Sequence, residues 1–197
     1  MNPADAPARL PTGARDVLPT EAAELRDAED ALRRVLRLNG YREVRTPTLE
    51  YGEAIERAAA RGVDEAYRLF DADGRVLVLR PDLTIPAARM IATRMADHPG
   101  PIRVFYTGSA FRLPQPGRPR LSEHRQAGAE LVGATGPEAD AELLELLCAC
   151  LRAAGLERFR VAVGSAAVMN ASSHHAPVGI SAPVKPKVSA ARTIEAR

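Results

Sequence analysis

Two strand-like segments separated by a polar arm constrain the fold of this chain more than any other feature of its sequence. Ile102–Thr107 is typical of a buried strand, and Phe111-Arg112 and His124–Val132 flank a loop rich in proline and arginine. Apolar runs on both sides of such a loop predict two paired antiparallel strands joined by a long arm. A chain with this hairpin at its centre is expected to build an antiparallel sheet around it.

A second hairpin is indicated by Tyr67–Phe70 and Val76–Leu79, because Asp71-Ala72-Asp73-Gly74 between them has the glycine that a tight turn needs. Residues 20–39 predict a long amphipathic helix, since apolar residues recur at helical spacing and Gly40 suits its C-terminal stop. Further helices are expected at 54–61, at 83–95 and from Pro137 to near Gly155, and strands at 41–49 and 159–163.

Pro47 cannot donate a hydrogen bond to a ladder, so the strand at 41–49 is expected to be interrupted or to lie at an edge. Hairpins alternate with helices, and no βαβ unit with a glycine-rich phosphate fingerprint is evident. The pattern therefore predicts an α+β fold, an antiparallel sheet flanked by helices.

The 197 residues suit one domain, which we expect to span residues 1–169. In residues 170–197 apolar periodicity is missing, three prolines occur, and Lys185 and Lys187 are the only lysines of the chain. This composition predicts a disordered tail. Cys148 and Cys150 are two positions apart on an expected helix, so they face different directions and are expected to stay unpaired.

A formal net charge of +2 gives no general case for nucleic-acid binding. No stretch approaches the roughly 20 apolar residues of a membrane span, and the first ten residues lack the pattern of a secretory signal. We therefore expect a cytoplasmic protein without a membrane partner.

Arginines gather on and near the central hairpin, at Arg112, Arg118 and Arg120. A guanidinium suits planar, bidentate capture of a phosphate or a carboxylate, although arginines in a hairpin loop are more commonly just solvated. Asp82 and Thr84 begin the expected helix at 83–95, where they could cap it or hold the ammonium group of a ligand.

Gln126, Gly128 and Glu130 are spaced two apart on the second strand of the central hairpin, and residues two apart share one face of a sheet. They could line one side of a pocket, with the glycine leaving room for a ligand. Glu130 could accept a hydrogen bond from a cationic or NH-bearing ligand, or could belong to a surface ion pair.

The sequence contains no CxxC, HExxH or P-loop pattern, and no nucleophile–base constellation is evident. His174-His175 is expected to be solvated, because nothing nearby would complete a metal site. We therefore predict no catalytic residue, no metal site and no cofactor.

Three segments, Gly40–Glu50, Leu79–Arg89 and Phe111–Glu130, together resemble histidyl-tRNA synthetase, a class II aminoacyl-tRNA synthetase, over residues 10–165. The resemblance implies a class II catalytic core, present in part. It implies a histidine-binding site in which Asp82 and Thr84 contact the ammonium, Gln126 the main-chain polar groups and Glu130 the imidazole, with Arg112 also lining the site. It further implies that Arg112 and Arg120 stand at phosphate-contacting positions of the family.

The sequence departs from the synthetase pattern at several points. Pro114 occupies the position of a glutamate that faces adenine in the family, and His124 that of an aromatic residue. Past residue 165 no counterpart of the third class II motif or of an anticodon-binding domain is recognised. The two phosphate-contacting positions are therefore expected to be vestigial, histidine affinity weak or lost, and tRNA not to be a partner.

With these departures, the sequence resembles the synthetase paralogue that serves as regulatory subunit of the short-form ATP phosphoribosyltransferase. That resemblance implies a non-catalytic chain that relays histidine feedback to the first step of histidine biosynthesis. Its implied partners are the catalytic subunit, histidine and a second copy in a homodimer within a hetero-oligomer. Two alternatives stay open: a fragment or divergent form of histidyl-tRNA synthetase with ATP-dependent histidine activation, and a remnant or small interaction module with neither role.

Overall fold

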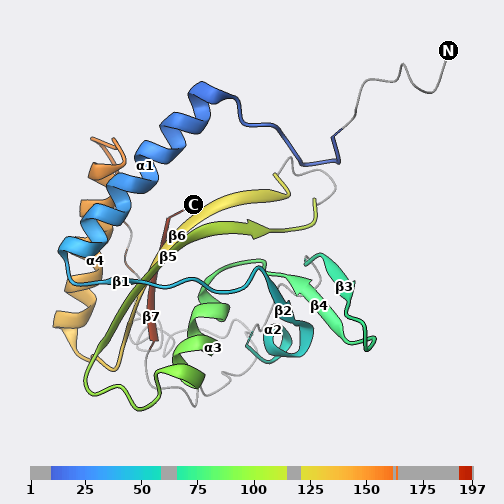
Figure 1. Ribbon diagram of the computed structural model, residues 1–197. Helices are drawn as coiled ribbons and strands as arrows, with labels where there is room; N and C mark the ends of the chain where they lie inside the picture. The colour runs from blue at the N-terminus through green and yellow to red at the C-terminus, as the bar shows by residue number, and fades with distance from the viewer. Residues whose placement is uncertain (1–9, 59–65, 115–120, 162, 164–190, 197) are drawn as a thin grey trace, which may run out of the picture.

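The computed structural model describes residues 10–58, 66–114, 121–161, 163 and 191–196 (Figure 1). Its helices are α1 (Pro19–Leu38), α2 (Gly52–Ala58), α3 (Thr84–Arg94) and α4 (Pro137–Ala153). Its strands are β1 (Arg42–Glu43), β2 (Leu49–Tyr51), β3 (Arg68–Phe70), β4 (Val76–Leu79), β5 (Ile102–Phe111), β6 (Glu123–Val132) and β7 (Ala191–Ala196). Among these described parts, no helix is long and apolar enough to cross a membrane.

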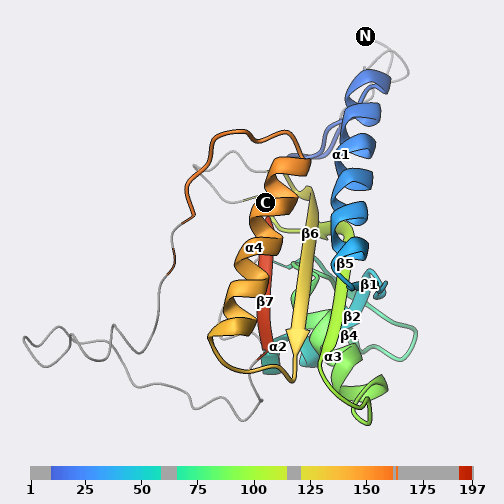
Figure 2. The same ribbon diagram turned by 90° about the vertical axis from the view of Figure 1, so that its left-hand side faces the viewer.

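Two sheets form the framework. The larger sheet has the strand order β1-β5-β6-β7 and the smaller one β2-β4-β3. The central hairpin pairs β5 with β6 in antiparallel register over its whole length, from Ile102 opposite Val132 to Phe111 opposite Glu123. Helices α1 and α4 cover one face of the larger sheet, and α3 lies on the other face (Figures 1 and 2). The predicted α+β fold is thus confirmed, with helices on both sides of the sheet.

The segment around Pro47 is interrupted, as its sequence predicts. β1 and β2 belong to different sheets, with Pro47 in the gap between them. One detail departs from the expected antiparallel arrangement, because the two-residue β1 runs parallel to β5, with Arg42 opposite Val104. The connection from β1 through the smaller sheet returns the chain to β5 in the same direction.

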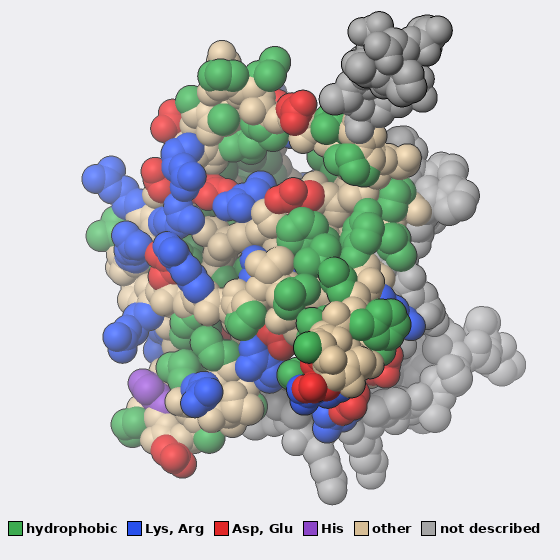
Figure 3. Space-filling view, turned by 45° about the vertical axis from the view of Figure 1, so that its right-hand side comes forward, with side chains coloured by type: hydrophobic (Ala, Val, Ile, Leu, Met, Phe, Trp, Pro, Cys, Tyr) green, Lys and Arg blue, Asp and Glu red, His purple; other side chains and the backbone are tan. Residues whose placement is uncertain are grey.

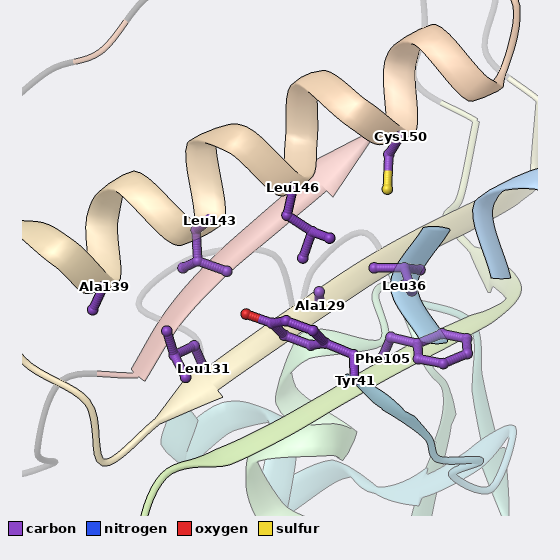
Figure 4. Close-up of a cluster of buried hydrophobic side chains, with 9 residues drawn as sticks. All are labelled: Leu36, Tyr41, Phe105, Ala129, Leu131, Ala139, Leu143, Leu146 and Cys150. Atoms are coloured by element: carbon purple, nitrogen blue, oxygen red, sulfur yellow. The ribbon is translucent and has the colours of Figure 1, made fainter. Parts of the chain in front are cut away.

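The main core lies between the larger sheet and the α1–α4 layer. Leu131 of β6 is fully buried beneath α4, and Phe105 of β5 is fully buried beside Tyr41 and beside Leu36 of α1 (Figure 4). Burying one such side chain contributes roughly 1.5–3 kcal/mol. Helix α1 contributes the buried Leu36 to this core, and the half-buried Leu32 and Val35 pack against it.

A second set of cores holds α3 in place. Leu83 and Ala87 pack on Tyr106 and Ala110 of β5. In the smaller sheet, Val78 packs with Ile55 and Ala66, with Ile85 of α3 against them. Helix α3 therefore lies between the two sheets, and its first turn points at the β5–β6 hairpin.

Ala191–Ala196, within the tail expected to be disordered over 170–197, forms a strand, β7, antiparallel to β6. β6 offers its second edge to a partner, and Thr193 and Ile194 are β-branched residues that favour strands. Residues 164–190 lie outside the described part of the chain.

The strand expected at 159–163 does not form in the described residues of that range. The Phe159 ring instead lies beneath the Arg152 guanidinium at the end of α4, 5.7 Å from the cation to the ring centroid. Beside β6, the position of a fourth strand is taken by β7.

Candidate functional site

The α3-facing side of the β5–β6 hairpin carries the polar residues that the alternation predicts. Gln126 lies opposite Gly108, and Gly128 lies opposite Tyr106. Glu130 is two residues further along β6 and belongs to the same face. Gln126 and Glu130 are each only 2% exposed. A buried carboxylate and a buried amide on one sheet face require partners, and the first turn of α3 and Tyr106 supply them.

The start of α3 is fastened to this face by its own polar groups. Asp82 accepts a hydrogen bond from the Ile85 backbone N–H at 3.0 Å. It therefore caps the helix, which is one of the two roles that the sequence predicts for it. The Leu83 backbone N–H donates to Oε1 of Gln126 at 3.0 Å. The helix start and β6 are therefore joined directly, which places Asp82 and Thr84 beside the polar face of the hairpin.

Tyr106 connects the two ends of the site. Its hydroxyl donates to Oε1 of Glu130 at 2.9 Å and lies 2.9 Å from Oγ1 of Thr84. The side chain is 1% exposed. Sequence reasoning gave Tyr106 no role. The register supplies the missing signal, because it sets a large polar aromatic residue directly opposite a glycine.

The absence of a side chain at Gly128 makes room for the Tyr106 ring. A Cβ built on Gly128 would lie 2.5 Å from the Tyr106 hydroxyl oxygen and 2.6 Å from two of its ring carbons. The interpretation that the glycine leaves room for a ligand is therefore wrong. The Tyr106 ring fills that room, and any ligand that reaches Glu130 must approach beside the ring rather than over Gly128.

Arg112 lies at the rim of the same site. Its Nε donates to the Pro81 carbonyl at 3.0 Å, next to Asp82, and its backbone N–H donates to the Ser122 carbonyl at 2.8 Å. The side chain is half-buried. The structure thus brings together five predicted residues, Asp82, Thr84, Arg112, Gln126 and Glu130. The sixth, Arg120, lies outside the described residues, as does Arg118.

Arg80 is a second residue whose role sequence reasoning missed. Its guanidinium donates to the Ser109 carbonyl at 2.9 Å and to the Thr46 and Pro47 carbonyls at 2.8 and 3.3 Å. Burial lowers the pKa of Arg80. A Cβ on Gly108 would lie 2.8 Å from this guanidinium, so Gly108 makes space for it. Arg80 therefore holds the segment that leads into Asp82 against β5.

The open end of the hairpin borders a cavity of about 730 Å³. His124 and Phe111 line it together with Tyr67, Leu79 and residues of the N-terminal segment from Pro11. His124 is half-buried and lies opposite Ala110. Pro114, also half-buried, follows β5 at the base of the arm. Helix α1 also lines this cavity, through Ala22, Leu25 and Glu29, whereas Asp82, Thr84, Gln126 and Glu130 are not among its lining residues.

In the described part of the chain, no three His, Cys, Asp or Glu side chains are grouped to hold a metal ion. Cys148 and Cys150 are free thiols, the first half-buried and the second buried, as their spacing predicts. His174-His175 lies outside the described residues.

The chain matches the family model described as histidyl-tRNA synthetase over residues 13–191. It is 47% identical to a protein of Symbiobacterium thermophilum over 163 residues, which cover 82% of this chain and 41% of that protein. A Moorella thermoacetica protein is 42% identical, covering 82% of this chain and 42% of its own length. Both are named ATP phosphoribosyltransferase regulatory subunit.

Solved structures agree with this similarity. A Bacillus halodurans protein titled ATP phosphoribosyltransferase regulatory subunit/histidyl-tRNA synthetase superposes with a TM-score of 0.77 at 36% identity, over 83% of this chain and 42% of that one. S. aureus histidyl-tRNA synthetase superposes with a TM-score of 0.65 at 28% identity, over 76% of this chain and 35% of that one. This chain therefore spans about two-fifths of the curated relatives' length. The predicted class II core is confirmed, in part of its extent, and the chain belongs to the histidyl-tRNA synthetase family.

Proposed function

We propose that this chain is part of a non-catalytic regulatory subunit of short-form ATP phosphoribosyltransferase, which binds histidine and relays feedback to the catalytic subunit. The main support is that hydrogen bonds join the start of α3, which carries Asp82 and Thr84, to the face of the hairpin that carries Gln126 and Glu130. The relatives named as that regulatory subunit, at 37–47% identity, support the same reading.

Free histidine has a cationic ammonium, an anionic carboxylate and an imidazole with an N–H donor. The carboxylate of Asp82 and the hydroxyl of Thr84 are acceptors suited to the ammonium, and the Arg112 guanidinium is suited to the carboxylate. Glu130 offers a buried carboxylate to the imidazole N–H. The Gln126 amide, which anchors the start of α3, borders the main-chain groups of the ligand.

We propose a non-catalytic subunit because the described side chains are suited to bind histidine but not to activate it with ATP. Histidine activation needs ATP with its phosphates neutralised and its adenine held, and that stabilisation depends on preorganised groups. Pro114 provides no side-chain acceptor at the adenine-facing position. The similarity to solved synthetases keeps histidine activation as the competing function, which an exchange assay decides.

Feedback in such an assembly is a coupling between two sites. Histidine inhibits only if it binds more tightly to one arrangement of the subunits than to the other, and the partner then alters histidine affinity by the same factor. Helix α3 is suited to transmit the change, because it contacts the proposed site at its first turn and the smaller sheet along its length. The expected setting is the cytoplasm, at the first step of histidine biosynthesis.

Titration calorimetry tests the proposal, with histidine at concentrations high enough to measure the weak affinity that the partial core predicts. Glu130→Gln keeps the shape of the side chain but removes its charge, and we expect at least a tenfold loss of histidine affinity, as for a hydrogen bond to a charged group of about 1.5–3 kcal/mol. Glu142→Gln is the matched control, since Glu142, like Glu130, accepts a hydrogen bond from a tyrosine hydroxyl, but it lies at the α4 side of the sheet and is also bonded by Arg103. Equal histidine affinity in both variants contradicts the placement of the site.

A second measurement tests the partner. A purified catalytic subunit of the short-form enzyme is mixed with the chain, and inhibition by histidine is followed. We expect association by light scattering and histidine inhibition that Glu130→Gln weakens. Association without any effect of histidine would contradict the relay, and no association would contradict the proposed partner.

A further inference from the structure

Tyr106 lies between the two ends of the proposed histidine site. Its hydroxyl is 2.9 Å from Thr84, at the end assigned to the ammonium, and 2.9 Å from Glu130, at the end assigned to the imidazole. Because Tyr106 donates its proton to Glu130, Thr84 supplies the proton of the other contact. A continuous line of hydrogen bonds thus runs from α3 through β5 to β6.

The ring of Tyr106 is held in place independently of these hydrogen bonds. It packs with Leu83 and Ala87 of α3 and with Ala110 of its own strand. On the β6 side it lies directly over Gly128, at a distance that leaves no space for a Cβ. The hydroxyl therefore has one reachable position, set by packing on both sides.

We infer that Tyr106 is a positioning residue of the proposed histidine site: it fixes the Glu130 carboxylate and sets the spacing between the ammonium and imidazole ends. This inference rests on the proposed function and adds a residue and a role to it. A carboxylate fixed at one oxygen presents a defined direction to an imidazole N–H, which favours histidine over amino acids whose side chains cannot place a donor there.

Two changes disturb this arrangement in different ways. Tyr106→Phe removes the hydroxyl and keeps the ring. Gly128→Ala keeps the hydroxyl and displaces the ring, since the added Cβ would lie 2.5 Å from the Tyr106 oxygen. If positioning is what matters, both variants weaken histidine binding although they alter different residues.

Tyr41→Phe is the matched control. Tyr41 is also buried, and its hydroxyl also donates to a glutamate, Oε1 of Glu142 at 2.8 Å, but on the face of the sheet beneath α4. The two Tyr→Phe variants lose the same kind of hydrogen bond. Their effects on thermal stability are expected to be similar, so a difference in histidine affinity reports on position rather than on general loosening.

The experiment is histidine calorimetry across pH on the unchanged chain and the three variants. We expect about a tenfold loss of affinity in Tyr106→Phe and in Gly128→Ala, and no change in Tyr41→Phe. Removing a donor from a carboxylate raises its pKa, so the acid-side loss of binding should move to higher pH in Tyr106→Phe. If the unchanged chain binds no histidine, the proposed function fails. If it binds histidine and Tyr106→Phe binds equally well with the same pH profile, the inference alone is overturned.

Discussion

The carboxylate of Glu50 on β2 accepts two hydrogen bonds from the guanidinium of Arg89 on α3, at 2.8 and 2.7 Å. Glu50 is 6% exposed, whereas the Arg89 side chain is 36% exposed. The pair joins the smaller sheet to the helix whose first turn borders the proposed site. Because Glu50 is more buried than Arg89, substituting Arg89 and substituting Glu50 should lower the stability by different amounts.

Arg89→Met should cost more stability than Glu50→Gln. Without Arg89 the Glu50 carboxylate stays buried and loses its two charged donors, which costs about 3 kcal/mol. Without the Glu50 charge, Arg89 is exposed enough to be solvated, and the loss is about 1 kcal/mol. Urea unfolding of the two variants measures the difference. Equal destabilisation, or a larger effect of Glu50→Gln, would show that the unpaired buried carboxylate of Glu50 is not the main cost.

Stability should fall in acid partly through Glu142. The Arg103 guanidinium donates two hydrogen bonds to Glu142, at 2.7 Å each, and holds the pKa of that carboxyl below its ordinary value of 4.5, while burial opposes the shift. A depressed folded-state pKa contributes stability that is present above 4.5 and lost as the pH falls through the lower folded value. Thermal unfolding of Glu142→Gln should therefore depend less on pH below 4.5 than that of the unchanged chain. Parallel curves would contradict this.

We expect the chain to self-associate through the outer face of the smaller sheet. Leu49 and Tyr51 of β2 share this face with Leu69 of β3, and all three are exposed. Leu77 and Leu79 of β4 complete it. Figure 3, which brings this side of the molecule forward, shows hydrophobic side chains gathered there.

The resemblance to class II enzymes implies an interface built by the long helix and the segment ending at Thr46-Pro47, and β2 continues directly from that segment. An exposed apolar face of this kind is suited to contact a second copy of the chain.

Light scattering at micromolar concentration tests this association. The unchanged chain should be a dimer, and Leu69→Asp should shift it toward monomer. Phe70→Asp is the control, because Phe70 is also exposed and adjacent, but alternation directs it to the other face of β3. A monomeric unchanged chain of good solubility would refute the dimer, and an equal effect of both variants would refute its location.

The chain alone should not activate histidine. Histidine-dependent exchange of pyrophosphate into ATP should stay at background, because Pro114 replaces the adenine-facing acid of the family. A full-length histidyl-tRNA synthetase serves as the positive control. Exchange clearly above background that Arg112→Ala abolishes would replace the regulatory proposal with the synthetase one.

Local patterns were sufficient to predict most of the framework. The turn at Asp71–Gly74 places β3 and β4 where the sequence indicates, and the helical period from Leu25 to Leu36 matches α1. The gap at Pro47 follows from its missing donor. The final strand was misplaced, because Phe159 has strand propensity but packs against Arg152 instead. Local propensity cannot say which of two segments will pair with the open edge of β6.

In the site, alternation along one strand predicted the shared face of Gln126 and Glu130, and helix-start chemistry predicted Asp82. The contributions of Tyr106 and Arg80 were missed, because both depend on register and on contacts between distant segments. Arg80 contacts residues about 30 positions away on either side. For Arg120 and for residues 170–190 the sequence-based expectations stay predictions.

The partners of Arg80 bear on how this family can change over time. Its guanidinium is satisfied mainly by the backbone carbonyls of Thr46, Pro47 and Ser109. Every amino acid has a carbonyl, so substitutions at those three positions can preserve the junction as long as the backbone keeps its path. Arg80 itself has no such freedom, because it uses two separate nitrogens, Nε for Ser109 and Nη1 for Thr46 and Pro47, and a lysine has only one. The junction should therefore tolerate side-chain changes at positions 46, 47 and 109 better than it tolerates Arg80→Lys.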